Sequence, residues 1–335
     1  MSDDAPVLEV RDLHVDYPLP GGWFSRKRAL HAVTGVDLVV PPARTVGIVG
    51  ESGCGKSTLA RAIVGLLRPT RGQVVVCGVD LATASRATMR RLRPMVQMVF
   101  QDPYASLNPW MSVHELISEP WRIHRGIVEP SDWDREVDRL LELVGLRPNQ
   151  RHLRPHQFSG GQRQRISLAR ALAMRPKLIV CDEVVSALDV SIRAQILNLL
   201  RDIQQETGVS YLFVSHDLGV VRHVADEVAV MYLGRIVEHG ATEHVFAEPA
   251  HPYTQALLSA APILDLDRGE AGEEIVLSGE VPSPLNPPSG CPFRTRCGKA
   301  RDLCAIEVPR LADRAVGHDV ACHFAAADAR FGIVG

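Results

Sequence analysis

A glycine-rich segment, GESGCGKST at residues 50–58, has the residue types and spacing that most directly predict chemistry in this chain. It fits the pattern G-x-x-x-x-G-K-[ST] and stands between a predicted strand, TVGIVG, and a predicted helix, STLARAIVGLL. Such glycines let backbone N–H groups and the helix N-terminus approach phosphate oxygens closely. We expect Lys56 to bridge the β- and γ-phosphates of ATP, and the Ser57 hydroxyl to ligate Mg²⁺. The predicted nucleotide contacts are Gly50, Ser52, Gly53, Cys54, Gly55, Lys56, Ser57 and Thr58.

A second group of candidate residues ends a predicted buried strand, LIVCDE, with two adjacent carboxylates. Because side chains alternate faces along a strand, Asp182 and Glu183 are expected to have different tasks. We expect Asp182 to reach the Mg²⁺ shell. Glu183 is expected to point toward the γ-phosphate, where an attacking water would be activated.

The segment FSGGQRQRISLARAL (158–172) narrows the reading from a general nucleotidase to one family. SGGQRQR followed by an amphipathic helix resembles the signature motif of ABC ATPases. The resemblance implies that Ser159, Gly160, Gly161 and Gln162 open a helix whose N-terminus holds a γ-phosphate. Because the chain already has a phosphate loop, a second phosphate-binding helix end implies a head-to-tail dimer with two shared ATP molecules.

Further elements of that family follow in the expected order. Gln101, in VFQDP, resembles the glutamine that senses Mg²⁺ and the attacking water, and SALD (186–189) resembles a loop at the dimer interface. His216 closes YLFVSH and resembles the switch histidine that contacts the γ-phosphate. Tyr17 stands where the family places an aromatic residue that stacks on adenine, although a tyrosine in an early strand is also common core material.

The elements that must position these residues predict an α/β fold. Buried strands alternate with amphipathic helices, which is typical of a parallel sheet covered on both faces. We expect a P-loop NTPase: a RecA-like parallel core with a β-rich N-terminal subdomain (7–100 and 177–245), and a helical subdomain with the signature motif (101–176). A small C-terminal extension with clustered cysteines (246–335) would follow.

The stretches VFQDPYASLNPWMSV and HPYTQALLSAAP resemble the ATPases of oligopeptide and dipeptide importers. This implies two membrane permease subunits and an external substrate-binding protein as partners, with contacts near residues 104–112. The insertion after Tyr17, PLPGGWFSRKRALHAV, favours the second of two related ATPases and hence a heterodimer. Peptides are the favoured solute, whereas glutathione, nickel chelates and oligosaccharides are the alternatives.

Four cysteines gather in the last 45 residues: Cys291, Cys297, Cys304 and Cys322. Their spacings are not those of a C-x2-C zinc site. Four thiolates suit either an iron–sulfur cluster or zinc, and a small module with little apolar content gains stability from a metal. The family resemblance favours a 4Fe–4S cluster over Zn²⁺, and cysteines without a ligand are the third possibility.

Composition limits the remaining classes. The formal net charge of −2 gives no electrostatic reason to expect nucleic acid as the main ligand. The chain has no run of 18 apolar residues and no secretory signal, so we expect it to stay in the cytoplasm. The resemblance to importer ATPases implies a peripheral protein at the cytoplasmic face of the cell membrane. A soluble ABC ATPase acting on DNA or ribosomes is the rival class, and a regulatory subunit with a degenerate site is a third.

Overall fold

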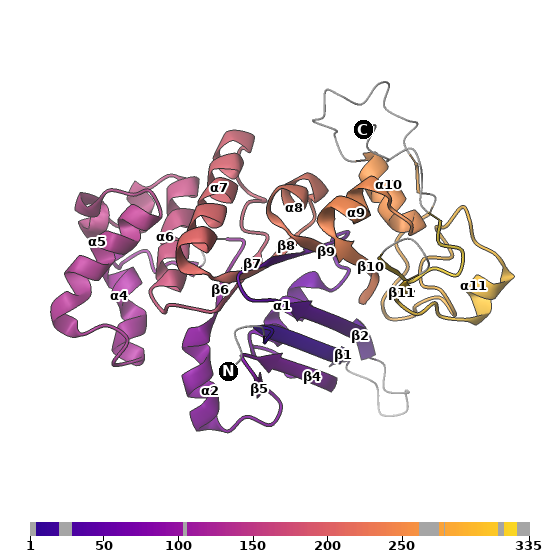
Figure 1. Cartoon of the computed structure of the whole chain (residues 1–335), viewed down its shortest axis with the longest axis horizontal. Helices are drawn as coiled ribbons and strands as arrows, with labels where there is room; N and C mark the ends of the chain where they lie inside the picture. Colours follow the sequence, from indigo (N-terminus) through magenta and orange to yellow (C-terminus); the bar gives the residue numbers. More distant parts are fainter. Residues whose placement is uncertain are drawn as a thin grey trace. The chain divides into compact units, whose positions relative to one another are not determined.

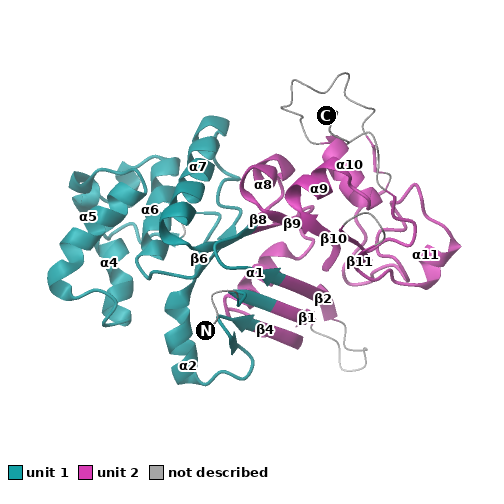
Figure 2. Ribbon diagram, in the orientation of Figure 1, with its two compact units in different colours: residues 1–9, 39–45, 75–213 teal, residues 10–38, 46–74, 214–335 magenta. Residues whose placement is uncertain are grey.

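The structure is a computed structural model that describes residues 5–19, 29–102, 106–260, 275–277, 279–313 and 318–326. The chain divides into two compact units (Figure 2). Unit 1 comprises residues 1–9, 39–45 and 75–213, and unit 2 comprises residues 10–38, 46–74 and 214–335. Each unit is therefore assembled from segments that are distant in sequence.

Unit 1 is a mixed α/β unit whose strands lie in the order β8-β7-β6. Its elements are β5 (Val79–Asp80), α2 (Arg86–Leu92), η1 (Arg93–Met95), β6 (Val96–Val99), α4 (Val113–Ile123), η2 (Pro130–Asp132), α5 (Trp133–Leu143), η3 (Pro148–His152), η4 (Pro155–Gln157), α6 (Gly160–Leu172), β7 (Leu178–Asp182), α7 (Val190–Thr207) and most of β8 (Ser210–Ser215). β6 and β7 pair in parallel, with Val96 opposite Leu178 and Val99 opposite Cys181. Every residue of β7 and β8 is buried, which confirms the prediction of strands covered on both faces.

The helical part of unit 1 consists mainly of α4, α5 and α6, which pack against one another (Figure 1). The apolar face predicted for α5 is buried, including Val137, Leu140 and Leu141. Trp121 of α4 is also buried, and its indole N–H donates to the Ala173 carbonyl oxygen just after α6 (2.8 Å). This core fixes the position of α6, the helix that carries the signature motif.

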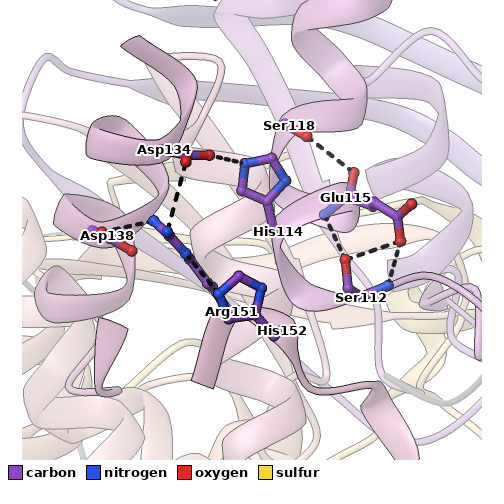
Figure 3. Close-up of polar contacts among 8 residues, drawn as sticks. All are labelled: Ser112, His114, Glu115, Ser118, Asp134, Asp138, Arg151 and His152. Carbon is purple, nitrogen blue, oxygen red and sulfur yellow. Dashed lines mark hydrogen bonds and ion pairs between the residues drawn. The ribbon is translucent and has the colours of Figure 1, made fainter. Parts of the chain in front are cut away.

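A capping box fixes the start of α4 (Figure 3). The Ser112 hydroxyl accepts a hydrogen bond from the Glu115 backbone N–H (3.3 Å), and the Glu115 carboxylate accepts one from the Ser112 N–H (2.7 Å). The Ser112 and Glu115 side chains thus satisfy two N–H groups that a helix end would otherwise leave unpaired.

A group of charged side chains joins three elements of the same subdomain (Figure 3). His114 Nε2 of α4 lies 2.8 Å from Asp134 Oδ1 of α5. Arg151 of η3 lies between Asp134 and Asp138, with Nη1 2.9 Å from Asp138 Oδ2. Because Asp134 is largely exposed, these contacts contribute specificity of packing more than stability.

Unit 2 contains the phosphate loop and the C-terminal extension. It includes most of β1 (Leu8–Pro18), β2 (Ala29–Val40), β3 (Thr45–Val49) and β4 (Arg71–Val76), together with α1 (Lys56–Ile63), α8 (Leu218–Val224), β9 (Glu227–Tyr232), β10 (Arg235–Ala241), α9 (Thr242–Ala247), α10 (Pro252–Ala260), α11 (Asp302–Ile306), β11 (Ala312–Asp313) and β12 (Asp319–Val320). β3 pairs with β9 in parallel, and β9, β10, β12 and β11 continue the sheet in antiparallel fashion. β2, β1 and β4 are neighbours in a separate sheet.

Two local predictions need correction. The helix expected over residues 57–67 ends at Ile63, because Gly65 has a left-handed φ of 73° and closes a Schellman motif. The N–H of Leu66 then bonds the Arg61 carbonyl oxygen (2.9 Å), and Leu66 is exposed and not part of the apolar face. In addition, the near period-two pattern of GQVVVCGVDL predicts a single strand, but the structure forms a hairpin of β4 and β5 that turns at Cys77 and Gly78, both at positive φ.

A third correction concerns α5, whose segment SDWDREVDRLLELVG predicts a helix that begins with a Ser/Asp cap. The side chain of Asp132, its N-cap residue, forms no capping hydrogen bond. Instead the one-turn helix η2 leads directly into α5.

No helix within the described ranges is both long and apolar enough to cross a bilayer.

Candidate nucleotide-binding site

The phosphate loop connects β3 to α1, as predicted. Gly50, Gly53 and Gly55 have φ values of 156°, 81° and 109°, a region that L-residues rarely adopt. A Cβ at Gly50 would lie 2.2 Å from the Met231 carbonyl oxygen, and one at Gly55 would lie 2.1 Å from the Ala32 carbonyl oxygen. The loop is thus wrapped closely by backbone of β9 and β2, and only glycine fits at its two ends.

A comparison of two of these glycines gives a prediction about the thermal stability of the protein measured without nucleotide. Gly55→Ala is expected to lower the thermal midpoint more than Gly53→Ala, because only the former places a methyl group against backbone, whereas Gly53 has nothing within 4 Å of an added Cβ. Both variants place an alanine at a left-handed φ, which alone costs about 1–2 kcal/mol of stability. Gly53→Ala therefore measures this backbone cost without the steric clash. Calorimetry of both variants checks this, and equal midpoints would contradict the packing described.

Lys56 is nearly enclosed, with 4% of its surface exposed. Its ammonium group donates to the carbonyl oxygens of Gly50 (2.7 Å) and Glu51 (3.0 Å) and lies 3.8 Å from Cys54 Sγ. Burial raises the pKa of the Cys54 thiol, and the Lys56 charge acts in the opposite direction. The lysine is therefore folded onto its own loop, and backbone carbonyl oxygens occupy two of the three N–H donors of its ammonium group.

Tyr17, the predicted adenine-stacking residue, lies on β1 and is only half-buried. Its hydroxyl is 3.5 Å from the Thr58 hydroxyl at the start of α1. The tyrosine is thus beside the helix that begins in the phosphate loop and is not enclosed in the core. Its role in stacking on adenine stays a prediction.

In unit 1 the acidic strand end has unusual backbone geometry. Asp182, the last residue of β7, is buried, whereas Glu183 has a φ of 52° and lies beyond the strand. A left-handed φ is uncommon for glutamate, and such strain gathers at functional sites. The two carboxylates are separated by this turn as well as by the strand alternation used in the prediction.

Gln101 and the loop after Glu183 are directly connected. Gln101 Nε2 donates to Ser186 Oγ (3.2 Å), and Ser186 Oγ donates to the Glu183 carbonyl oxygen (2.9 Å). Within unit 1 the structure therefore brings together Gln101, the acidic strand end at Glu183 and the SALD loop. Ser186 is the bridge, a role that the SALD resemblance did not specify.

The signature motif forms the N-terminus of α6, where Ser159 is the N-cap. The Ser159 hydroxyl accepts from the Gln162 N–H (3.3 Å), and Gln162 Oε1 accepts from the Ser159 N–H (3.0 Å). A Cβ on Gly161 would lie 2.5 Å from Ile192 Cγ2, so this glycine admits α7 against the start of α6. The Gln162 side chain is occupied by the capping box, although the sequence predicted a nucleotide contact for it.

His216 follows β8 and is exposed, as a residue that meets a γ-phosphate must be. It belongs to unit 2 with the phosphate loop and Tyr17, whereas Gln101, Asp182, Glu183 and the signature motif belong to unit 1. Residues 103–105 of VFQDPYASLNPWMSV, a segment that resembles importer ATPases, lie outside the described residues. Residues 20–28 of the insertion that favours a heterodimer also lie outside them.

The four tail cysteines are all free thiols. The pKa of Cys291 is raised to about 11, mainly by burial; the Phe293 N–H lowers it, and the charges of the other three cysteines contribute a smaller rise to this value. Burial likewise raises the pKa of Cys297 and of Cys322, and the charge of Cys304 raises each of them as well. Over the part of the chain that the structure describes, no group of three or more His, Cys, Asp or Glu side chains is arranged to hold a metal ion.

Comparisons with known proteins define the class. The model of the ABC transporter family matches residues 33–186, and the model of the oligopeptide/dipeptide transporter C-terminal region matches residues 237–304. Among solved structures, cbiO1 from Clostridium perfringens, part of the ABC transporter complex cbiONQ, has a TM-score of 0.63 and 28% identity over 72% of this chain and 91% of its own. The dimeric, post-hydrolysis ATP-binding cassette MJ0796 with ADP and Pi has a TM-score of 0.60 and 25% identity over 70% and 98%. The fold is that of a P-loop ABC ATPase, as predicted.

Relatives of known assignment are similar over nearly the whole chain. The oligopeptide transport ATP-binding protein AppF of Bacillus subtilis is 47% identical, covering 95% of this chain and 97% of its own. OppF of Salmonella typhimurium is 50% identical, covering 94% and 95%. The di/tripeptide transport protein DppF of Pseudomonas aeruginosa is 47% identical, covering 95% and 98%. This chain belongs to the family of ABC transporter ATP-binding proteins, in the group with the oligopeptide/dipeptide C-terminal region.

Proposed function

We propose that this chain hydrolyses ATP to drive import of peptides through a membrane ABC transporter. The observation that carries the proposal is a complete phosphate loop and signature helix followed by the C-terminal region matched by oligopeptide and dipeptide transporters. The named functions of AppF, OppF and DppF support peptides over glutathione, nickel chelates or oligosaccharides.

Peptide uptake by cells is the decisive assay. Deleting this chain from its host should abolish uptake of a labelled tripeptide, and plasmid-borne wild type should restore it. A Lys56→Ala plasmid should not restore it. Normal peptide uptake in the deletion strain, together with lost uptake of another solute, would contradict the peptide assignment while leaving the ATPase assignment intact.

The roles of individual residues remain the ones predicted from the sequence. Glu183 would activate the attacking water, His216 would orient the γ-phosphate, and Gln101 would relay the state of the site to the membrane subunits. The exposed position of His216 and the link from Gln101 through Ser186 to Glu183 support these roles. Mg²⁺, held by Ser57, Asp182 and Gln101, would neutralise phosphate charge.

The partners we propose are a second related ATPase, two permease subunits and an external substrate-binding protein, assembled at the cytoplasmic face of the cell membrane. The exposed N-terminus of α6 supports a dimer in which each signature motif meets the partner's nucleotide. Gel filtration with an ATPase assay of this chain alone tests the heterodimer. A stable, fully active homodimer that drives transport without another ATPase would reject it.

We also propose that the four tail cysteines hold a structural 4Fe–4S cluster, with Zn²⁺ as the alternative. By ligand type four thiolates suit either iron or zinc, although the described residues show no group of three or more such side chains already arranged around a metal position. The N–H two residues after Cys291, Cys297 and Cys322 acts on each sulfur and opposes the burial that raises its pKa, and at Cys322 the Phe324 N–H is 3.4 Å from the sulfur. A metal cation would supply the charge that stabilises buried thiolates.

Anaerobic purification followed by visible absorbance and metal analysis tests the cluster. Brown protein with iron and sulfide in equal amounts is expected, and Cys304→Ser should remove the colour. Colourless protein with stoichiometric zinc would assign Zn²⁺. Protein that is purified without metal and whose thermal stability does not change when iron or zinc is supplied would reject both.

A further inference from the structure

Glu51, the residue after Gly50 in the phosphate loop, is held by the C-terminal extension at two points. Its backbone N–H donates to the Tyr253 hydroxyl at 2.8 Å. Its carboxylate accepts two hydrogen bonds from Arg296, from Nη1 at 2.8 Å and from Nη2 at 3.2 Å. Both partners lie more than 200 residues further along the chain, and all three residues belong to unit 2.

Arg296 is itself held rigidly. Its side chain is 9% exposed, and its N–H donates to the Phe293 carbonyl oxygen (3.0 Å). The Phe293 ring packs against Tyr232 and Tyr253, with ring centroids 5.2 and 5.5 Å apart. The guanidinium therefore projects from a well-packed aromatic cluster and is not a mobile surface group.

The geometry of the ion pair indicates more than a surface contact. Two parallel N–H···O bonds from one guanidinium to one carboxylate fix orientation as well as distance. The Glu51 carboxylate is 26% exposed, so both charges are largely removed from water. Removing one partner of such a pair leaves the other without compensation and changes local structure.

The pair acts on the segment that must bind phosphate. Lys56 donates to the Glu51 carbonyl oxygen, so the residue that Arg296 and Tyr253 hold also contacts the lysine expected to bind phosphate. The contacts from Arg296 and Tyr253 thus fix the part of the loop that lies next to this lysine.

We infer that Arg296 is a positioning residue for the phosphate loop: through Glu51 it pre-organises the loop, so that the C-terminal extension sets the affinity for nucleotide. The inference rests on nucleotide binding by this loop, as assigned above. Pre-organisation lowers the ordering cost of binding and should affect affinity more than the chemical step.

Titration of Mg·ADP into the full-length chain by calorimetry tests this, since ADP engages the phosphate loop without needing hydrolysis. Arg296→Gln should raise Kd about tenfold, and Arg296→Lys, which keeps the charge but loses the fork, should raise it about threefold. Glu51→Gln should raise Kd by a similar factor, and the double variant Glu51→Gln/Arg296→Gln should be little worse than either single variant. In the assembled transporter, KM for ATP should rise while kcat stays within about twofold.

Arg294→Gln is the matched control. Arg294 lies two residues away in the same module, and among the described residues its guanidinium donates to the carbonyl and hydroxyl oxygens of Ser289, so the variant should leave Kd unchanged. Wild-type Kd in a folded Arg296→Gln variant, or an equal loss in Arg294→Gln, would overturn the inference, as would additive effects in the double variant. If Arg296→Gln does not fold, Glu51→Gln decides, because it leaves the extension intact. Failure of the wild type to bind ADP would instead refute nucleotide binding itself.

Discussion

Replacing Glu183 with glutamine is expected to lower the rate of ATP hydrolysis at least about 100-fold while leaving ATP binding intact, since a positioned general base contributes this much or more. The amide keeps the size of the side chain but cannot accept a proton from water. Closed, ATP-bound dimers should therefore accumulate. Phosphate release by the transporter and nucleotide retention on gel filtration measure the two effects.

The control for this variant is Glu129→Gln, an exposed acid at the N-cap of η2 in the same unit. It should hydrolyse ATP at the wild-type rate. Turnover in Glu183→Gln at the rate of this control would remove Glu183 from the role of base.

Lys56→Ala is expected to raise the Kd for Mg·ATP by about 10- to 100-fold, because a charged hydrogen-bond donor is worth about 1.5–3 kcal/mol. The variant also loses the bonds from Lys56 to the Gly50 and Glu51 carbonyl oxygens, so the free loop should exchange its amide hydrogens faster. Calorimetric titration and hydrogen exchange measure the two effects.

Lys299→Ala is the control for Lys56→Ala, because Lys299 lies in the same unit and its ammonium group donates to the side chain of Gln255 (3.0 Å). This variant should keep wild-type affinity. Unchanged Mg·ATP binding in Lys56→Ala would contradict the assignment of the loop.

The local motifs could be predicted from sequence because their chemistry depends on short spacings. The glycines of the phosphate loop, the cap at Ser159 and the buried strand ending at Asp182 all lie where the patterns indicate. Each is fixed by interactions within a few residues, and hydrophobic periodicity or a turn residue reports such interactions directly.

The remaining features depend on neighbours that sequence spacing does not show. The apolar pattern continued through Leu66, but the left-handed Gly65 ended α1 earlier, and a glycine after a helical run was the available signal. Glu51 and Arg296 are 245 residues apart, so no periodicity links them. The pattern HPYTQ indicates only an importer-type tail, although the hydroxyl of its tyrosine, Tyr253, accepts a hydrogen bond from the Glu51 N–H of the phosphate loop.

The central claim is that the phosphate loop of one subunit and the signature helix of another enclose the same ATP. Light scattering of Glu183→Gln together with the proposed second ATPase and Mg²⁺ tests it most directly. The account predicts a dimer with ATP and separate subunits with ADP. It also predicts no dimer with ATP when Ser159→Arg is introduced in this chain and the same change is made at the equivalent position of the second ATPase. Equal association in ATP, in ADP and without nucleotide would contradict it.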